Sequence, residues 1–152
     1  MIRTALVFGL FLVAGPAIAA DIVGTPKIVD GETLEVDGKR FRLAGIDAPD
    51  PRQTCFIRNR EYPCGRISTT ALMDLVAGVK VRCRADDKEP GVARCWAGSY
   101  ELSEGMVHTG WALATPRDHK RFAPIERQAA KARRELWQGE FVMPWDWKPD
   151  VK

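Results

Sequence analysis

Two runs of alternating apolar and polar residues, joined by the dipeptide Asp37-Gly38, constrain the fold of this chain more than any other feature. The runs cover residues 33–36 and 40–46, and alternation of this kind is typical of half-buried strands. Asp-Gly between two such runs is a strong short-range signal for a tight turn. The sequence therefore predicts a β-hairpin at this position.

Acidic residues stand at both margins of the predicted hairpin, with one arginine between them. In chain order these residues are Asp30, Glu32, Arg42, Asp47 and Asp50. Because a hairpin brings its far ends together, the five side chains can converge on one pocket. Clustered oxygen ligands suit a hard divalent cation such as Ca²⁺, and a guanidinium beside them suits a phosphate.

Structural roles for the same residues stay open from the sequence. An aspartate placed like Asp30 commonly caps a turn. Arg42 could equally form an ion pair with Asp47 or with Asp50.

The first 19 of the 152 residues have the pattern of a secretory signal peptide. Arg3 gives the positive start, residues 4–14 form an apolar run, and residues 17–19 offer a small-residue cleavage site. The run is shorter than the roughly 20 residues that a membrane-spanning helix needs, although a membrane anchor is the alternative. We therefore expect a signal peptide at 1–19 and one domain at 20–152. The protein would be secreted or periplasmic, with no membrane segment after cleavage.

The net charge is mild and gives little guidance on partners. Without residues 1–19 the chain has 22 basic and 20 acidic residues, a charge of +2. Such a charge does not by itself indicate nucleic-acid binding. Residues 117–134, however, hold seven basic residues and two acidic ones. This segment is either a surface facing an anionic polymer or a solvated helix face, and we expect a monomer.

Four cysteines in an exported chain favour disulfides. Three pairings are possible, and we favour Cys55–Cys64 and Cys83–Cys95. The first pair would staple the loop after Asp50, and the second would link two neighbouring strands. Each such bond stabilises a fold by about 2–4 kcal/mol. A zinc site is the competing interpretation, but the ligand spacing is poor and histidine is scarce.

Helical periodicity predicts three helices, over residues 66–77, 102–109 and 124–136. Gly110 ends the second helix, and Pro124 is expected in the first turn of the third. Extended runs at residues 79–84 and 92–97 predict two further strands. The aromatic tail at residues 141–147 is expected to pack back on the body.

A series of short motifs follows in a fixed order after residue 24. They are residues 30–33 (Asp-Gly-Glu-Thr), 42–43 (Arg-Leu), 47–50 (Asp-Ala-Pro-Asp), 62–65 (Tyr-Pro-Cys-Gly), 110–112 (Gly-Trp-Ala) and 136–137 (Leu-Trp). Their order and spacing resemble those of the staphylococcal nuclease (thermonuclease) family. The resemblance implies an α+β fold, a five-stranded Greek-key OB-fold barrel with three helices. It also implies Ca²⁺-dependent hydrolysis of phosphodiester bonds in DNA or RNA.

Residue roles follow from the same resemblance. Glu32, Asp47 and the carbonyl of Ala48 match metal ligands. Arg42 matches the first phosphate-binding arginine, and Asp50 takes the place of a glutamate base. The family has aspartate where this chain has Glu32, so this side chain is one methylene longer. Asp50 is one methylene shorter than the glutamate that it replaces. A misplacement of about 1 Å can cost roughly 10²-fold in rate.

A second arginine of the family, just before its fifth strand, has no counterpart after Gly91. Lys88 or Arg94 could bind substrate in its place. Loss of one charge-stabilising donor typically costs on the order of 10²–10³-fold. Two functions therefore stay open. One is a metal-dependent nuclease with an altered, weakened site. The other is a catalytically impaired module that binds an anionic polymer, either nucleic acid or exopolysaccharide, or a protein partner.

Overall fold

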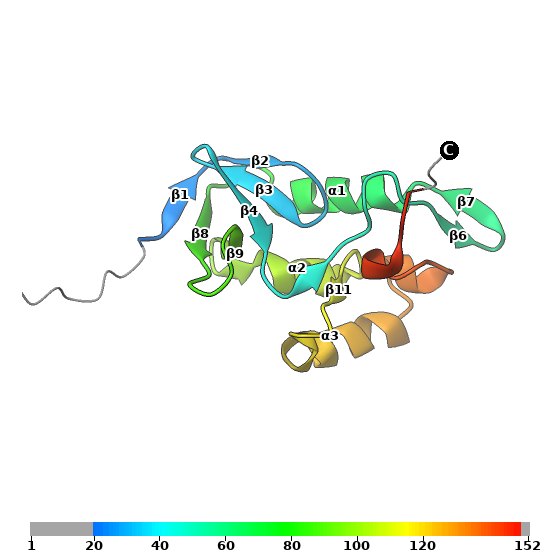
Figure 1. Cartoon of the computed structure of the whole chain (residues 1–152). Helices are drawn as coiled ribbons and strands as arrows, with labels where there is room; N and C mark the ends of the chain where they lie inside the picture. The colour runs from blue at the N-terminus through cyan, green and yellow to red at the C-terminus, as the bar shows by residue number, and fades with distance from the viewer. Residues whose placement is uncertain (1–19, 150–152) are drawn as a thin grey trace, which may run out of the picture.

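The computed structural model describes residues 20–149, so the signal peptide expected at 1–19 lies outside the described residues. Two of the three helices pack against a strongly bent sheet, and the third packs on the second (Figure 1). A small hairpin and the C-terminal segment lie at the far end. Across residues 20–149 none of the helices combines the length and apolarity needed to cross a bilayer. The mixed α+β architecture agrees with the expected OB-like fold.

The strands are short, and most of them belong to one sheet. Its members are β1 (Ile22–Gly24), β2 (Pro26–Ile28), β3 (Thr33–Val36), β4 (Lys39–Leu43), β8 (Val81–Ala85), β9 (Val92–Ala97) and β10 (Tyr100–Glu101). The strand order is β1-β8-β9-β4-β3-β2, with β10 paired to β9. Neighbours are antiparallel except β4 and β9, which are parallel. Two small ladders complete the set, β5 (Ile46–Asp47) with β11 (Leu113–Ala114) and β6 (Cys55–Ile57) with β7 (Arg60–Tyr62).

The predicted hairpin is confirmed as the β3–β4 pair. Asp37 and Gly38 have φ values of 51° and 72°, the left-handed conformation that a tight two-residue turn requires. The second strand ends earlier than predicted, at Leu43. Gly45 follows with φ of 78°, and a Cβ there would lie 2.8 Å from the Phe122 ring. The chain therefore bends at this glycine before β5 carries the predicted ligand Asp47.

The helices are α1 (Cys64–Leu75), α2 (Leu102–Thr109) and α3 (His119–Lys131). The second helix has its predicted bounds, and Gly110 ends it with φ of 88°. The prediction for the third helix was wrong, because α3 begins five residues before Pro124 and ends before Ala132. Pro124 lies inside the helix near its N-terminal end, where its missing N–H removes one backbone bond. Two 3₁₀ turns follow, Glu135–Gln138 and Pro144–Asp146.

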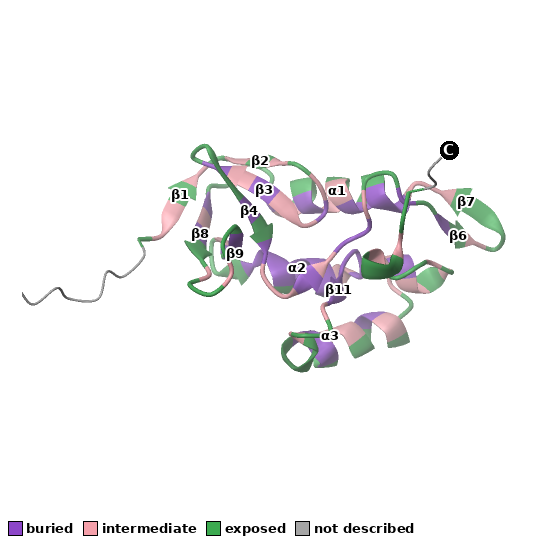
Figure 2. Cartoon of the chain, viewed as in Figure 1, coloured by how far each residue is buried: buried purple, intermediate pink, exposed green. Residues whose placement is uncertain are grey.

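The core lies where α1 and α2 meet the concave side of the sheet, and Figure 2 shows buried residues concentrated along α2 and β11. Its largest fully buried side chains include Leu34, Leu43, Leu72, Met106, Phe122 and Leu136. Phe141 packs against this core, so the tail returns to the body as expected. Both predicted disulfides are present. Cys83 and Cys95 face each other across β8 and β9, and Cys55–Cys64 joins β6 to the start of α1.

Candidate active site

The four predicted acids, Asp30, Glu32, Asp47 and Asp50, line a single hollow of about 240 Å³, here called the acid pocket. Glu32 stands just before β3, Asp47 ends β5, and Asp50 lies in the loop that follows. The hairpin thus brings these acids together as the sequence predicted. Between residues 20 and 149, no three Asp, Glu, His or Cys side chains are grouped closely enough to hold a metal ion. A cation in the acid pocket would therefore need carbonyl and water oxygens as well.

Asp30 has a structural contact in this pocket. Its Oδ1 accepts hydrogen bonds from the backbone N–H groups of Glu32, at 2.9 Å, and Thr33, at 2.7 Å. This is the turn-capping geometry that the sequence left open. The intervening Gly31 lets α1 approach, because a Cβ there would lie 2.2 Å from Ser68 Oγ and 2.9 Å from Ala48 Cβ. Asp30 and Gly31 together fix where the backbone of Glu32 starts.

Glu32 and Asp47 form the buried part of the acid pocket. Burial first, and then the negative charge of Asp47, raise the pKa of Glu32 to about 8, against a backbone hydrogen bond from Ala48 that lowers it. That bond joins Ala48 N to Glu32 Oε2 at 3.0 Å. Burial also raises the pKa of Asp47, and the charge of Arg42 opposes this. The two carboxyls hold more negative charge than their surroundings neutralise, which favours either a proton or a cation.

Asp50 is in a different electrostatic state. Its Oδ1 accepts hydrogen bonds from Arg52, at 2.9 Å from the backbone N and 3.0 Å from Nε. The side-chain bond to Arg52 is the main cause that lowers the pKa of Asp50. Arg52 also lies over the Trp147 ring, 5.6 Å from its centroid. Arg52 was not among the predicted site residues, although its position two residues after Asp50 was a usable signal.

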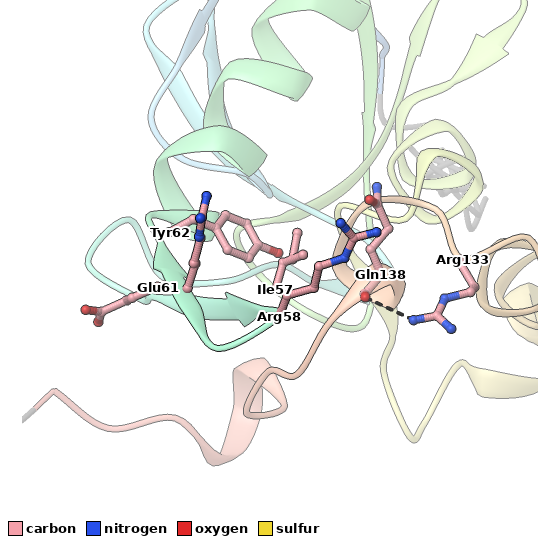
Figure 3. A pocket seen from close by; sticks show the side chains of 7 residues that line it. Ile57, Arg58, Glu61, Tyr62, Arg133 and Gln138 are labelled. Carbon is pink, nitrogen blue, oxygen red and sulfur yellow. Dashed lines mark hydrogen bonds between the residues drawn. The ribbon is translucent and has the colours of Figure 1, made fainter.

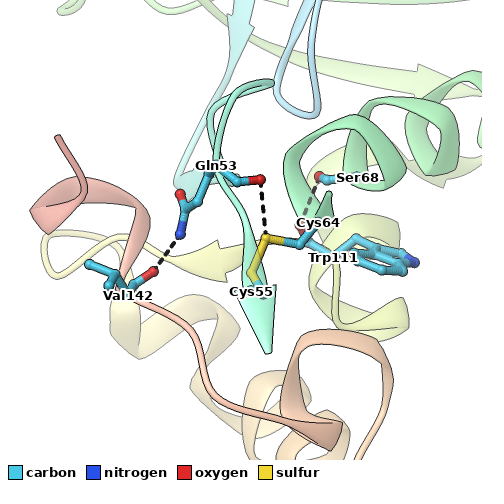
Figure 4. The surroundings of a disulfide bond; sticks show 6 residues. All are labelled: Gln53, Cys55, Cys64, Ser68, Trp111 and Val142. Atoms are coloured by element: carbon cyan, nitrogen blue, oxygen red, sulfur yellow. Dashed lines mark hydrogen bonds between the residues drawn. A yellow bond between two sulfur atoms is a disulfide. The ribbon is translucent and has the colours of Figure 1, made fainter. Parts of the chain in front are cut away.

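The loop that carries Asp50 is tightly supported. A Cβ at Gly65, in the first turn of α1, would lie 1.7 Å from the Asp50 carbonyl oxygen. The buried Gln53 donates from its backbone N–H to that carbonyl, at 2.7 Å, and from Nε2 to Val142 O, also at 2.7 Å. Figure 4 shows this second bond, which ties the C-terminal segment to the loop. As a result Pro144 and Trp147 reach the edge of the acid pocket.

Arg42 opens on a neighbouring hollow of about 170 Å³. Its Nη2 lies 3.1 Å from Glu89 Oε1, and the Nη2 of Arg117 lies 2.8 Å from Glu89 Oε2. Two guanidiniums therefore share one carboxylate, an arrangement here called the arginine pair. The ion-pair partner of Arg42 is therefore Glu89. The alternative considered from the sequence, an ion pair with Asp47 or Asp50, is wrong. Arg42 still lies near enough to lower the pKa of Glu32 by its charge.

The predicted substitutes for the second arginine lie elsewhere. Arg94 pairs with the buried Glu101, at 2.9 Å, and Arg121 contacts the same carboxylate. Lys88 is exposed in a turn that the Asp86 carboxylate caps through the backbone N–H of Lys88, at 2.8 Å. Neither residue lines the hollow of Arg42, whereas Arg117 does. The basic composition of residues 117–134 was the only sequence signal for Arg117.

The comparison with known families bears directly on this geometry. The family described as "Staphylococcal nuclease homologue" matches residues 40–139, which include Arg42, Asp47 and Asp50. The chain belongs to this staphylococcal nuclease family. The resemblance inferred from the short motifs is therefore confirmed.

Individual relatives of this staphylococcal nuclease homologue have diverse names. The succinoglycan biosynthesis protein ExoI of Rhizobium meliloti (strain 1021) is 28% identical over 134 residues, covering 84% of this chain and 70% of that protein. The probable staphylococcal-like nuclease CAN2 of Oryza sativa subsp. japonica is 32% identical over 134 residues, covering 83% and 34%. Protein ParB of Escherichia coli is 29% identical, covering 97% and 90%. The chain thus spans about a third of the rice protein and most of the bacterial ones.

Proposed function

We propose that this protein is a divalent-cation-dependent phosphodiester hydrolase that acts on single-stranded DNA or RNA, with Ca²⁺ as the cation. The observation that carries the proposal is the half-buried Glu32–Asp47 carboxyl pair, which lies near enough to Arg42 to feel its charge. Two carboxylates with the Ala48 carbonyl are the donor set that a hard cation prefers. The raised pKa values are the mark of carboxyls whose negative charge lacks compensation. The residues present therefore fit such an ion.

Glu32, Asp47 and the carbonyl of Ala48 would hold the cation. A bound divalent cation supplies polarisation of a phosphate oxygen and offsets negative charge. Asp50, whose pKa is lowered, stays a carboxylate near neutral pH and would orient or deprotonate the attacking water. Arg42, joined by Arg117, would bind the phosphate oxygens through charge-assisted hydrogen bonds. Arg117 takes the role for which Lys88 and Arg94 were the predicted candidates.

A second function is favoured by the ion pairs of the same residues. Asp50 is bound to Arg52, and Arg42 is bound to Glu89, so both predicted catalytic side chains have internal partners. A protein with such a site could bind an anionic polymer without cleaving it. One relative is named as a succinoglycan biosynthesis protein, which makes an exopolysaccharide role the natural form of this alternative.

Export from the cytoplasm is part of the proposal. Two disulfides link all four cysteines, and stable disulfides are typical of oxidising compartments. We propose a secreted or periplasmic protein that acts as a monomer. Fractionation of cells producing the full chain would test the compartment, and mass analysis of the exported product would test cleavage near residue 20.

The decisive experiment measures hydrolysis and cation binding together. Purified protein is incubated with Ca²⁺ and a labelled single-stranded oligodeoxynucleotide, and Ca²⁺ uptake is followed by calorimetry. We expect weak cleavage that Glu32→Gln, Asp47→Asn and Asp50→Ala each abolish. We also expect Ca²⁺ uptake to be lost in Glu32→Gln and Asp47→Asn.

The matched control is Asp74→Asn, which removes an exposed carboxylate of α1 outside the acid pocket. It should leave both cleavage and Ca²⁺ uptake unchanged. Ca²⁺ uptake without cleavage would favour the binding module. Neither uptake nor cleavage at high protein concentration would remove the hydrolase proposal.

A further inference from the structure

A hollow of about 950 Å³ lies between the β6–β7 hairpin and the segment that follows α3. It is separate from the acid pocket and from the arginine pair, and no residue lines more than one of the three. Arg58, Arg60 and Tyr62 come from the hairpin, and Arg133 and Gln138 come from the other side. Figure 3 shows these side chains around the opening. We call it the hairpin hollow.

The three arginines that line the hairpin hollow have no acidic partner among the described residues. Within residues 20–149 no carboxylate oxygen lies within 4.0 Å of the side-chain nitrogens of Arg58, Arg60 or Arg133. Arg133 donates one hydrogen bond to the carbonyl of Gln138, at 3.2 Å. Glu61 is the one acidic residue in the lining, so positive charge is in excess there.

Two of these arginines sit on backbone that L-residues seldom adopt. Arg58 has φ of 51° in the hairpin turn, and Arg133 has φ of 52° just after α3. Such conformations are uncommon for residues other than glycine, and they cluster at ligand sites. Here the strained positions hold two guanidiniums at the rim of one hollow.

Tyr62 adds an unused hydrogen-bonding group. Its hydroxyl oxygen is buried and has no partner among residues 20–149. In Figure 3 the hydroxyl end of the ring points toward Ile57 and Arg58. A buried hydroxyl without a partner is costly, because a buried polar group normally forms a hydrogen bond. An anionic oxygen near Arg58 could accept from this hydroxyl.

The hairpin hollow is close to the acid pocket along the chain. Arg58 follows Asp50 by eight positions, so a fully extended chain would span at most about 29 Å between them. The Cys55–Cys64 disulfide anchors the base of the hairpin to α1, which also supports the acid pocket. Single strands bound to OB folds occupy roughly 4–16 nucleotides. One strand can therefore reach both places.

We propose that the hairpin hollow is a second subsite for the phosphate backbone of a single-stranded nucleic acid whose scissile phosphate lies in the acid pocket. This inference rests on the proposed function. A strand with a full negative charge on every nucleotide matches three neighbouring guanidiniums that no carboxylate neutralises. Guanidiniums bind phosphate oxygens in bidentate pairs, and the Tyr62 hydroxyl supplies one further donor.

The test measures binding in EDTA, so that hydrolysis plays no part. Fluorescence anisotropy compares a single-stranded oligodeoxynucleotide of about 16 nucleotides with one of about 3 nucleotides. The variant combines Arg58→Gln, Arg60→Gln and Arg133→Gln. We expect its affinity for the long strand to fall roughly 10- to 100-fold at low salt, and its slope of log K against log salt to fall by about 2. Affinity for the short strand should stay within about twofold, because that strand cannot span both subsites.

The control removes the same amount of charge from exposed residues outside the hairpin hollow, by Arg66→Gln, Lys80→Gln and Arg127→Gln. An equal loss of affinity in this control would overturn the proposal, as would an unchanged salt slope in the hairpin variant. Binding of a carboxylated polysaccharide but of no oligonucleotide would also overturn it. If the triple variant fails to fold, Arg60→Gln alone should lower the salt slope by about 0.7.

Failure of the proposed function would look different. If the wild type cleaves nothing, but the hairpin variant still binds the long strand more weakly than the wild type, the hydrolase is refuted and the subsite is kept. If the wild type cleaves, but the hairpin variant keeps the wild-type affinity for the long strand, the subsite is refuted and the hydrolase is kept.

Discussion

The acid pocket and the arginine pair are adjacent, yet they treat charge in opposite ways. In the acid pocket, burial raises the pKa values of Glu32 and Asp47, and the negative charge of Asp47 raises that of Glu32 further. In the arginine pair, Glu89 lies within 3.1 Å of Arg42 and 2.8 Å of Arg117. The acid pocket therefore favours binding of an external cation, whereas the arginine pair already has an internal carboxylate, Glu89, as its anion.

This contrast bears on the proposed function, because the two halves would bind different ligands. A buried carboxyl pair gains most from a divalent cation when nothing inside the protein offsets it. An arginine pair closed by a carboxylate must exchange that carboxylate for a phosphate before it can act. We expect cation binding to be the better preserved of the two functions.

Among the variants that test this contrast, the largest effect should come from Arg42, because its charge acts on both halves. Arg42→Gln removes the positive charge that lowers the pKa values of Glu32 and Asp47, and it removes one side of the arginine pair. We expect cleavage of single-stranded DNA to fall on the order of 10²–10³-fold in kcat. Arg40→Gln, two residues earlier on β4 and exposed, is the matched control. Equal losses of cleavage in both variants would show that Arg42 acts only through its long-range charge, and not through its place between the acid pocket and Glu89.

The pH dependence of stability tests the acid pocket alone. The pKa of Glu32 is raised from 4.5 to about 8, so folding stabilises its protonated form. Its contribution to the free energy of unfolding is complete below about pH 4.5 and is lost as the pH rises through about 8. In EDTA we expect this free energy to fall by on the order of 1–3 kcal/mol between about pH 5 and pH 8.

Urea titrations across this pH range would measure the loss. Glu32→Gln should flatten the profile, while Asp74→Asn should keep it. Added Ca²⁺ should stabilise the wild type more at about pH 8 than at about pH 5, because a cation competes with the proton. A wild-type slope that persists in Glu32→Gln would mean that another group causes it.

Opening the arginine pair should have a smaller effect. Glu89→Gln removes the shared charge and keeps the shape of the side chain, so both guanidiniums become available to an anion. We expect affinity for inorganic pyrophosphate, measured by calorimetry, to rise about 10-fold, which corresponds to about 1.4 kcal/mol. In an Arg117→Gln background the gain should largely vanish. A full gain in that background would exclude Arg117 from the anion site.

Local sequence chemistry predicted the parts of this molecule that depend on neighbours in the chain. The Asp37-Gly38 turn, the bounds of α2 ending at Gly110, and the Cys83–Cys95 pairing across adjacent strands each follow from a short-range rule. The start of α3 was mispredicted because proline favours the first turn of a helix, whereas Pro124 is the sixth residue of α3 and one backbone hydrogen bond is lost there.

The parts that depend on distant segments were beyond prediction from local rules. Arg117 reaches Glu89 only because the β4–β9 pairing and the β5–β11 ladder bring their loops together. Trp147 reaches the acid pocket because the buried Gln53 holds the carbonyl of Val142. Neither contact leaves a periodic pattern or a turn motif in the sequence.

The smallest effect is predicted for Lys88. It decides which basic side chain joins Arg42 in binding the phosphate. If the turn before β9 supplied that side chain, as the position of Lys88 suggested, Lys88→Gln would lower cleavage as much as Arg117→Gln. The structure instead leaves Lys88 outside the hollow of Arg42 and puts Arg117 within it. We therefore expect Lys88→Gln to change cleavage and pyrophosphate affinity by less than about twofold, the range of an exposed charge. Arg117→Gln should lower both by roughly 10-fold or more. The two variants remove one positive charge each, so long-range electrostatics cancels in the comparison, and only direct contact with the bound anion can separate them.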